Sequence, residues 1–346
     1  MNDLTEQFIE RIRAASSDSP LRIRGGGSKD FYGEIPRGEI LDTRGHGGIV
    51  AYEPTELVVT ARCGTPLAEI EAVLAEQNQF LAFEPPSFAN ATIGGVVAAG
   101  LSGPRRAAVG AVRDFVLGVQ LLDGESRRLT FGGQVMKNVA GYDVSRLIAG
   151  SLGTLGLILE VSLKVLPRPV AETTLRLDMP QAKAIEAMNA WAGQPLPISA
   201  SCWCDDILTL RLSGARAAVA SAREKLGGEA VADADAFWSG LREQRHEFFA
   251  GEESLWRLSL PSVTPPLSGT QLIEWSGSQR WLRGDAEAVR AAAAGAGGHA
   301  TLFRSGDKSA GVFQPLLPAL MQIHRQLKAA FDPRGVFNPG RLYPDF

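Results

Sequence analysis

The sequence predicts an α+β protein of two domains, and three observations lead to this prediction. The chain has 346 residues, a length that suits two globular domains better than one. Of its 38 glycines, 22 precede residue 169, whereas all six tryptophans follow it. Short strands separated by glycine turns fill the first half, and helices alternate with strands in the second. The Pro167-Arg168-Pro169 step cannot continue a helix, so the predicted domains are residues 1–168 and 169–346.

The first half is rich in strands and irregular. Leu4, Phe8 and Ile12, four residues apart, predict a short amphipathic helix at the N-terminus. Thr65 is expected to cap a second helix that has Pro66 at its first position. Strands are predicted at Leu21–Arg24, Leu57–Ala61, Phe115–Leu122 and Leu155–Val165. This order does not fit a regular doubly wound βαβ sheet.

The second half alternates more evenly between helices and strands. Helices are predicted around Ile185–Trp191 and at Ala215–Leu226, Phe237–Phe249 and Ala286–Ala294. Strands are predicted at Ile198–Cys204, Ile207–Leu212, Leu255–Leu260, Gln271–Trp275, Arg280–Leu282 and Thr301–Arg304. The helix–strand–strand–helix order favours an antiparallel sheet covered by helices on one face.

The composition excludes several classes of protein. With 45% hydrophobic and 21% charged residues, the chain is expected to be globular rather than disordered. A net charge of −3 predicts no general attraction to nucleic acid or anionic lipid. Glycines interrupt the longest apolar stretch, Leu147–Val161, so no transmembrane span is expected. The N-terminus lacks a signal-peptide pattern, and three cysteines are too few for a usual iron–sulfur cluster, so the expected compartment is the cytoplasm.

Four glycine-rich segments are the candidates for function, and the first is Ile23–Lys29, with the sequence Ile-Arg-Gly-Gly-Gly-Ser-Lys. Three consecutive glycines leave N–H groups free to curl round an anion, and without Cβ atoms the chain can approach a diphosphate closely. Arg24, Ser28 and Lys29 add charge and a hydroxyl donor. A flexible surface turn is equally compatible with this segment alone. It is neither a Walker loop nor a GxGxxG motif, because GxxxxGK[ST] is absent and no helical pattern follows.

The other three segments are Pro85–Arg105, Lys137–Asp143 and Gly150–Ile158. Pro85–Arg105 has too many glycines for a stable helix and too few branched residues for a strand. Such a stretch suits backbone that lies against a flat ring system, with Thr92 and Ser102 as polar groups. The last two segments, taken alone, could each be a tight structural loop.

In this order and spacing, the segments resemble the flavoprotein family built on the PCMH-type FAD-binding domain, the vanillyl-alcohol oxidase group. The resemblance covers about residues 20–168, through the diphosphate loop, ATIGG, SGPRR…VRD, GYD and GSLGTLG. It is closest to FAD-binding subunits of glycolate oxidases, to which Leu255–Pro261, Ile273–Leu282 and Phe331–Arg341 are also similar. The resemblance implies FAD between two α/β subdomains. It also implies a shortened α+β cap domain with an antiparallel sheet, whose C-terminal tail returns toward the flavin domain.

The resemblance further implies roles for matching residues. Those that would hold the pyrophosphate are Arg24, Gly25, Gly26, Gly27, Ser28 and Lys29. Those that would line the rest of the dinucleotide and the flavin are Pro86, Thr92, Ile93, Gly94, Gly95, Ser102 and Gly103. Ile158 would meet the adenine side, after a turn that contains Gly153 and Gly156. Relatives that attach flavin covalently often carry a histidine where this chain has Ser28, so the expected FAD is non-covalent.

Departures from the family shape the expected function. The substrate-oxidising sister subunit usually has a metal and base motif of the HxGDGNxH type, which is absent here, and often a Glu where this chain has Leu152. We therefore expect an FAD-binding subunit of a glycolate oxidase complex that takes part in oxidation of glycolate to glyoxylate. Two alternatives stay open: an independent FAD-dependent 2-hydroxy acid dehydrogenase, and a non-catalytic subunit that FAD stabilises. No catalytic residue and no metal ligand is assigned.

The expected partners are a catalytic flavin subunit and an iron–sulfur subunit of the same complex. Contact with the inner membrane, if any, is expected to be peripheral and to come through these partners. A large apolar interface is expected on one face of the second domain or on Asp332–Arg341.

The cysteines and histidines are the residues that could form a metal site. Cys202 and Cys204 lie on one face of a predicted strand and could begin a metal site. Two buried core cysteines are the simpler interpretation, because no further cysteine or histidine is near in the sequence. The four histidines are scattered and form no metal-binding pattern.

Several large side chains of the second half also have two interpretations. Arg257, Arg280 and Arg341 could clamp a substrate carboxylate, or they could pair with acidic neighbours or a partner subunit. Trp275 and Trp281 could stack near the flavin, or they could belong to the aromatic core. The sequence alone leaves both questions open.

Overall fold

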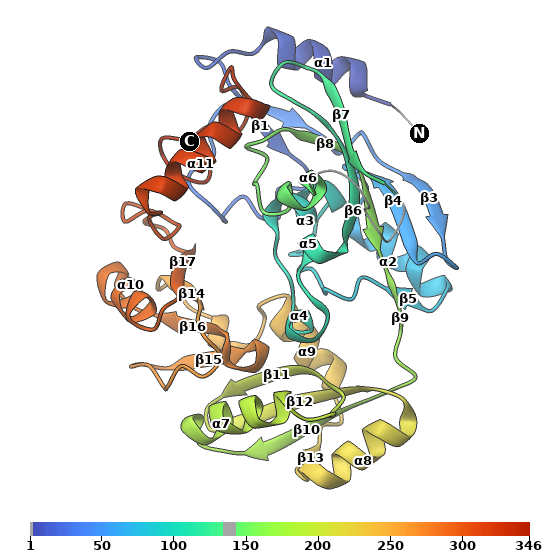
Figure 1. Ribbon diagram of the computed structural model, residues 1–346, viewed down its shortest axis with the longest axis vertical. Coiled ribbons are helices and arrows are strands. Elements are labelled where there is room, and N and C mark those ends of the chain that lie inside the picture. Colours follow the sequence, from blue (N-terminus) through green and yellow to red (C-terminus); the bar gives the residue numbers. More distant parts are fainter. Residues whose placement is uncertain (1–2, 134–142) are drawn as a thin grey trace. The chain divides into compact units, whose positions relative to one another are not determined.

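The computed structural model describes residues 3–133 and 143–346 (Figure 1). The chain forms two compact units, each built from separate segments. The first unit comprises the residues up to Leu101, Ala111–Pro167 and Pro315–Phe346, and the second comprises Ser102–Gly110 and Arg168–Gln314. This division differs from the predicted 1–168 and 169–346, because residues 102–110 belong to the second unit and 315–346 to the first.

A five-stranded antiparallel sheet forms the centre of the first unit (Figure 1). Its strands, in spatial order, are β3 (Ile49–Glu53), β4 (Val58–Arg62), β8 (Leu157–Lys164), β6 (Val116–Leu122) and β7 (Arg128–Gly132). The central strand β8 is almost fully buried, as its near-continuous apolar sequence predicts. The predicted strands at Leu57–Ala61, Phe115–Leu122 and Leu155–Val165 are confirmed within one or two residues at each end.

Two short strand pairs and several helices complete the first unit. β1 (Leu21–Arg24) pairs in parallel with β2 (Glu39–Asp42), and β5 (Gln79–Phe80) pairs with β9 (Leu166–Pro167). The helices are α1 (Thr5–Ala14), α2 (Leu67–Glu76), α3 (Ile93–Ala99), α5 (Val112–Phe115), α6 (Val144–Leu147) and α11 (Pro318–Phe331). Phe8 and Ile12 of α1 are buried against β1 and β8, as the four-residue spacing predicts. No helix in the described ranges is long and apolar enough to cross a membrane.

Two local predictions in the first unit are wrong. Thr65 does not cap α2, because its hydroxyl donates to the Arg62 carbonyl (2.7 Å) and accepts the Gly48 N–H (2.9 Å). The segment at Ile93–Ala99, predicted to be neither helix nor strand, is helix α3. Glycine is required within it, because a Cβ atom on Gly94 would lie 2.6 Å from the Cys63 Cβ. Burial of the helix therefore outweighs the low helix propensity of glycine.

The second unit is built on an eight-stranded sheet in which every pairing is antiparallel. Its spatial order is β13 (Glu229–Ala230), β10 (Ala171–Asp178), β12 (Ile207–Gly214), β11 (Ile198–Cys204), β15 (Gln271–Glu274), β16 (Gln279–Arg283), β14 (Leu255–Ser259) and β17 (His299–Arg304). The predicted α+β class with an antiparallel sheet is therefore confirmed.

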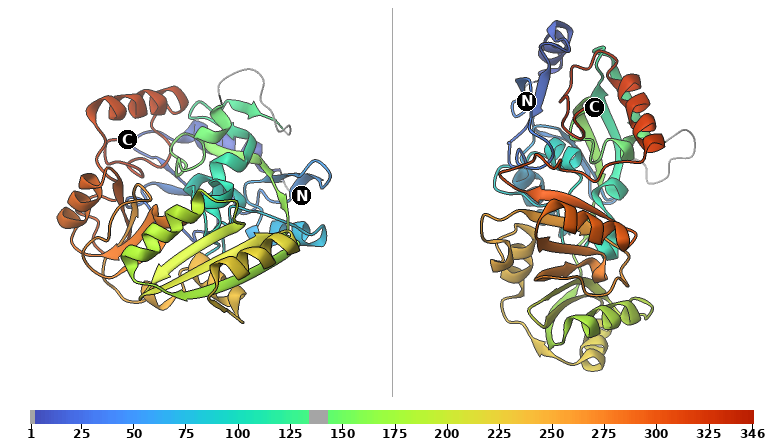
Figure 2. Two further views of the ribbon diagram at one scale, coloured as in Figure 1. Left: turned by 60° about the horizontal axis from the view of Figure 1, so that its bottom comes forward. Right: turned by 90° about the vertical axis from the view of Figure 1, so that its left-hand side faces the viewer.

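Three helices of the second unit pack on one face of this sheet: α7 (Gln181–Ala192), α8 (Arg216–Leu226) and α10 (Ala286–Gly295). Figure 2 shows α7 and α8 lying along the strands. A short helix, α4 (Arg106–Val109), lies beside β11. Helix α9 (Ala234–Arg242) contacts the opposite face of the sheet through a hydrogen bond from Trp238 Nε1 to Thr174 Oγ1 (2.9 Å). It ends earlier than predicted and is followed by a short 3₁₀ turn, η1 (Glu247–Phe249). The prediction that helices cover only one face of the sheet is therefore wrong, because α9 lies on the other face.

Candidate cofactor site

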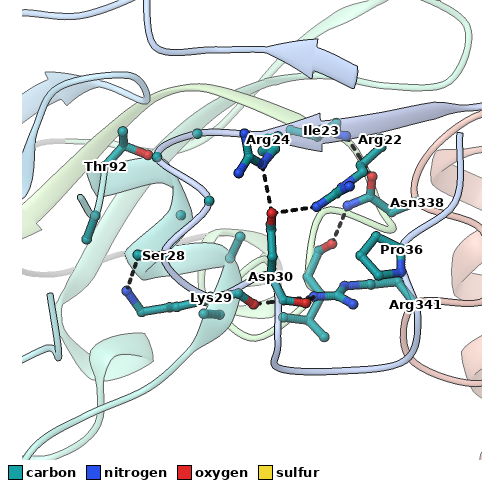
Figure 3. A pocket seen from close by; sticks show the side chains of 18 of the residues that line it. Arg22, Ile23, Arg24, Ser28, Lys29, Asp30, Pro36, Thr92, Asn338 and Arg341 are labelled. Carbon is teal, nitrogen blue, oxygen red and sulfur yellow. Dashed lines mark hydrogen bonds and ion pairs between the residues drawn. The ribbon is translucent and has the colours of Figure 1, made fainter. Parts of the chain in front are cut away.

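The first glycine segment leaves β1 and passes against residues 90–92, where only glycine fits (Figure 3). A Cβ atom on Gly26 would lie 1.4 Å from the Asn90 carbonyl oxygen, and one on Gly25 would lie 2.2 Å from Thr92 Oγ1. Gly27 has a φ of 72°, in the left-handed region that favours glycine. The three glycines are therefore needed for both close approach and backbone conformation.

This loop presents polar groups that the rest of the chain does not use. The backbone N–H groups of Gly26, Gly27 and Ser28 donate to no other residue in the described ranges. Thr92 Oγ1 is buried and has no partner within them. Unsatisfied buried polar groups are costly, so a ligand rich in oxygen acceptors would complete this site. A curled run of N–H groups is typical of diphosphate-binding loops.

Basic side chains surround the loop. Arg22 and Arg24 both pair with Asp30 Oδ2, at 2.5 and 2.8 Å (Figure 3). Lys29 Nζ lies 3.3 Å from Ser28 Oγ. The glycine loop lines a pocket, called the first pocket below, which Arg37 also lines. With Arg341, five basic residues of the described chain line this pocket against one carboxylate, a balance that favours an anionic ligand.

A second pocket continues from the first and is mostly apolar. The two share lining residues on β1, the glycine loop, α3, the glycine turn between α6 and β8, and the C-terminal segment: Ile23, Gly25, Gly95, Ala98, Leu152 and Asn338. Residues that line only the second pocket are Thr43, Cys63, Gly94, Gly153, Gly156, Leu157 and Ile158. The small residues of α3 let a ligand lie against the helix backbone. A charged end and an apolar end together suit a dinucleotide with a diphosphate centre.

The structure brings together most of the predicted cofactor-binding residues. Those that line one of the two pockets are Arg24, Gly25, Gly26, Gly27, Ser28, Lys29, Thr92, Gly94, Gly95, Gly153, Gly156 and Ile158. Pro86 and Ile93 are buried and line neither pocket. Ser102 and Gly103 belong to the second unit, where the Gly103 carbonyl accepts a hydrogen bond from Trp275 Nε1 (3.0 Å). Of the Lys137–Asp143 segment, all but Asp143 lies outside the described residues.

Sequence reasoning missed the pocket roles of Arg22, Asp30, Asn338 and Arg341. The last two come from the C-terminal segment, more than 300 residues from the glycine loop. The similarity of Phe331–Arg341 to the family was visible in the sequence, but nothing local indicated which loop this segment would meet.

Two of the three arginines considered as carboxylate clamps, Arg280 and Arg341, donate to backbone carbonyls. Arg280 is fully buried and donates to the carbonyls of Pro265 (2.8 Å), Gly277 (3.3 Å) and Thr264. Arg341 likewise donates to several backbone carbonyls. Burial lowers the pKa of each guanidinium to about 10, so both stay charged at neutral pH. Arg257 lies 5.6 Å from the Phe303 ring centre.

The cysteines and tryptophans of the second unit are core residues. Cys202 and Cys204 are buried, and burial raises the pKa of the Cys204 thiol to about 12. Among the residues the structure describes, no group of three or more potential ligands could hold a metal ion. Trp281 packs edge-on against Phe249 (5.3 Å) and Phe303 (4.9 Å) in an aromatic cluster.

Comparisons with known proteins agree with this geometry. The family described as "FAD binding domain" matches residues 4–145. The glycolate oxidase subunit GlcE of Escherichia coli is 51% identical over 349 aligned residues, which cover 99% of this chain and 98% of the relative. The chain belongs to the family of this subunit. It therefore carries the FAD binding domain of that family, and the glycine loop lies within the matched residues.

More distant relatives match about half of this chain. The glycolate oxidase subunit GlcD of Bacillus subtilis is 30% identical over 48% of this chain and 36% of its own length. A D-lactate dehydrogenase of Archaeoglobus fulgidus is 30% identical over 54% of this chain and 42% of its own length. A solved structure of alkyldihydroxyacetonephosphate synthase covers 97% of this chain and 74% of its own, with a TM-score of 0.65 and 14% identity. At that identity the similarity shows the fold alone.

Proposed function

We propose that this chain is the FAD-binding subunit of a glycolate oxidase complex and takes part in the oxidation of glycolate to glyoxylate. The observation that carries the proposal is the glycine loop, whose N–H donors have no partner in the described chain, in a protein 51% identical to a glycolate oxidase subunit over 99% of its length. Bound FAD would supply hydride and electron transfer, for which protein side chains have no equivalent. The chain's own residues bind and orient the cofactor.

The pocket residues fit the parts of FAD. The N–H groups of Gly26, Gly27 and Ser28 would donate to the diphosphate, while Arg24 and Lys29 would offset its charge. Thr92 Oγ1, buried without a partner in the described chain, would gain one from the cofactor. Small residues on α3 would let the flat and apolar parts lie against the helix.

We propose that the FAD is held without a covalent bond. No histidine lines either pocket. Cys63, which lines the second pocket, is fully buried, and burial raises the pKa of its thiol to about 12. A protonated thiol is a poor nucleophile, so it does not suit attachment of a flavin. On acid precipitation of the purified protein, all yellow colour should move to the supernatant. Colour that stays in the pellet would contradict non-covalent binding.

Among the residues that the structure describes, none in the two pockets is a free base for substrate oxidation. Asp30 is the one described carboxylate that lines them, and it pairs with both Arg22 and Arg24. A base that removes the hydroxyl proton of a 2-hydroxy acid needs access to the substrate and a suitable pKa. This supports a subunit that works beside a catalytic flavin subunit and an iron–sulfur subunit. Any association with the inner membrane would come through these partners.

Anaerobic addition of glycolate to the chain, alone and co-expressed with both partners, tests this proposal. Flavin absorbance should fall in the complex, with little change in the isolated chain. Bleaching of the isolated chain at the rate of the complex would favour the independent dehydrogenase, the activity named for the Archaeoglobus fulgidus relative. Full complex activity after FAD binding is abolished here would favour the non-catalytic alternative.

Helix α11 offers a surface for one of these partners. Leu317, Leu320 and Ile323 are 71%, 47% and 57% exposed, and the helix buries none of its residues. An isolated helix of 14 residues is marginal in water, so a covered face would stabilise it. The helix carries no carboxylate, and its Lys328 ammonium is already taken up by Asp332, so the partner surface that fits its exposed residues is mainly apolar. We propose that another subunit of the complex docks here.

The predicted interface at Asp332–Arg341 is not available, because Asp332, Phe337 and Arg341 are buried in the chain itself.

A test of α11 as the docking surface is the double variant L320D/I323D, which should reduce co-purification of the partner subunits while FAD content stays unchanged. V263D, which changes a 67% exposed apolar residue of the second unit, is the matched control. Equal loss in both variants, or loss in neither, would argue against α11 as the docking surface.

A further inference from the structure

The C-terminal segment Asp332–Arg341, called the tail below, runs beside the strand that leads into the glycine loop. The Leu21 N–H donates to the Val336 carbonyl (2.7 Å), and the Asn338 N–H donates to the Leu21 carbonyl (2.9 Å). Leu21 and Phe337 thereby form a parallel bridge. The tail is thus held on β1 by backbone hydrogen bonds of the kind that join strands in a sheet.

The side chain of Asn338 joins two walls of the cofactor pocket (Figure 3). Its Oδ1 accepts the Ile23 N–H (2.7 Å), and its Nδ2 donates to the Leu152 carbonyl (2.6 Å). Ile23 lies two residues before the first glycine of the loop, and Leu152 directly precedes Gly153. One buried amide therefore sets the spacing between the glycine loop and the second glycine turn. Asn338 also has a φ of 41°, a conformation that asparagine tolerates better than most residues.

Arg341 holds the loop that follows Ser28. Its guanidinium donates to the carbonyl of Asp30 (3.0 Å) and to those of Tyr32 and Glu34. The Glu34 N–H donates back to the Arg341 carbonyl (3.0 Å). These bonds join the far end of the tail to the basic rim of the first pocket.

A buried ion pair secures the start of the tail. Lys328 Nζ lies 2.6 Å from Asp332 Oδ2 and also donates to the carbonyls of Thr154 (2.7 Å) and Phe337 (2.9 Å). The Asp332 carboxylate accepts the N–H groups of Val336 (3.0 Å) and Phe337 (2.8 Å). The tail is therefore fixed at both ends, and Asn338 lies between these two anchors.

We infer that Asn338 is a positioning residue for FAD, which acts by holding the Ile23 and Leu152 backbones at the spacing that the diphosphate and adenosine ends require. The inference rests on the proposed FAD binding and adds a residue 315 positions away from Ile23 in the sequence. Its effect passes through the backbone of both glycine segments. Loss of the amide should widen or loosen the pocket, which weakens every ligand that needs both walls.

The test compares N338A, N338D and N189A in FAD-free protein titrated with FAD and with ADP. N338A should raise the Kd of both ligands about tenfold or more, because two hydrogen bonds that position the pocket are lost. N338D keeps an acceptor for the Ile23 N–H but sets a carboxylate against the Leu152 carbonyl in a pocket for an anion, so its affinity should fall at least as far as that of N338A. Asn189 is the matched control, because its amide bridges the Ile185 and Ser262 carbonyls in the second unit (2.8 and 3.1 Å).

Thermal unfolding separates positioning from general destabilisation. N189A and N338A should both lower the melting temperature of the FAD-free protein. Addition of FAD, at a concentration that saturates the wild type, raises the melting temperature further, and only N338A should reduce this increase. Wild-type affinity for FAD and ADP in N338A would overturn the inference, as would an equal loss in N189A. If N338A does not fold, the titrations are done with N338D, and wild-type affinity of N338D for FAD and ADP would also overturn the inference. Failure of the wild-type protein to bind FAD would instead defeat the proposed function.

Discussion

The glycine loop of the first unit and the surroundings of Arg280 in the second treat their polar groups in opposite ways. In the first unit, the N–H groups of the glycine loop and Thr92 Oγ1 have no partner in the described chain. In the second unit, buried Arg280 donates to the carbonyls of Thr264, Pro265 and Gly277, and Glu274 accepts from Trp281 Nε1 (2.7 Å) and Gln279 Nε2 (2.9 Å). Because an unsatisfied buried group costs about 1–3 kcal/mol, a fold retains such groups where a ligand completes them. The open donors therefore mark the glycine loop as a binding site, and the satisfied donors of Arg280 mark a structural contact.

The glycines differ in the same way. Gly95 of α3 lines both pockets, and a Cβ atom there would meet only Thr92 Oγ1, at 3.4 Å. Gly295 of α10 would meet nothing within 4 Å. A side chain can thus be added to either helix without a clash inside the protein, but at Gly95 it would enter the space proposed for FAD.

The largest expected effect is loss of FAD binding in G95V. The branched side chain should fill the pocket while the helix keeps its fold, since valine is no worse than glycine for helix formation. FAD affinity should fall at least about a hundredfold, measured by flavin fluorescence titration and by the flavin content of purified protein.

G295V is the control and should keep wild-type flavin content. The same comparison at Gly26 is less clean, because its added side chain would strike the Asn90 carbonyl as well as the cofactor space. Full flavin occupancy in G95V would mean that FAD does not lie against α3.

The second unit should respond in stability and not in cofactor binding. R280M leaves the Thr264, Pro265 and Gly277 carbonyls without their buried donor, so the free energy of unfolding should fall by about 3 kcal/mol. Urea unfolding measures this change, and FAD titration should show an unchanged Kd. If stability stays the same and the KM for glycolate rises in the assembled complex, Arg280 has a role in substrate binding after all.

The smallest expected effect is the pH dependence of the first unit through His46. Burial lowers the pKa of His46, against a smaller opposing effect of Asp3, and its Nδ1 accepts the Leu4 N–H (3.2 Å). The unfolded chain therefore binds a proton below a pH of about 6.5 that the folded chain does not yet bind, so stability should fall as the pH drops below that value.

H46N keeps an acceptor and cannot titrate, which makes it the matched variant. Its loss of stability between pH 7 and pH 5.5 should be smaller than that of the wild type by less than about 1 kcal/mol. Identical pH profiles for the two proteins would show that His46 titrates alike in the folded and unfolded states.

The sequence by itself determined the elements whose side chains repeat with a regular period. The strands at Leu21–Arg24 and Ile198–Cys204 have the predicted bounds. The helix predicted after Thr65 is α2, whose apolar residues Leu67, Ile70 and Leu74 recur at helical spacing on its buried face. The end of β1 at the glycine loop was also predictable, because three consecutive glycines do not favour continuation of a strand. These features depend on neighbours within a few residues, which a sequence displays directly.

Only the tertiary structure decided the features that depend on distant neighbours. Ile93–Ala99 is a helix because its glycines let it pack against Cys63, although local propensity disfavours a helix there. Thr65 bonds to residues of two strand ends instead of capping a helix. Asn338 becomes part of the cofactor pocket through contacts with Ile23 and Leu152, 315 and 186 positions away. Such contacts form only when the chain is folded, because packing and hydrogen-bond satisfaction outweigh local preference and neither is encoded in adjacent residues.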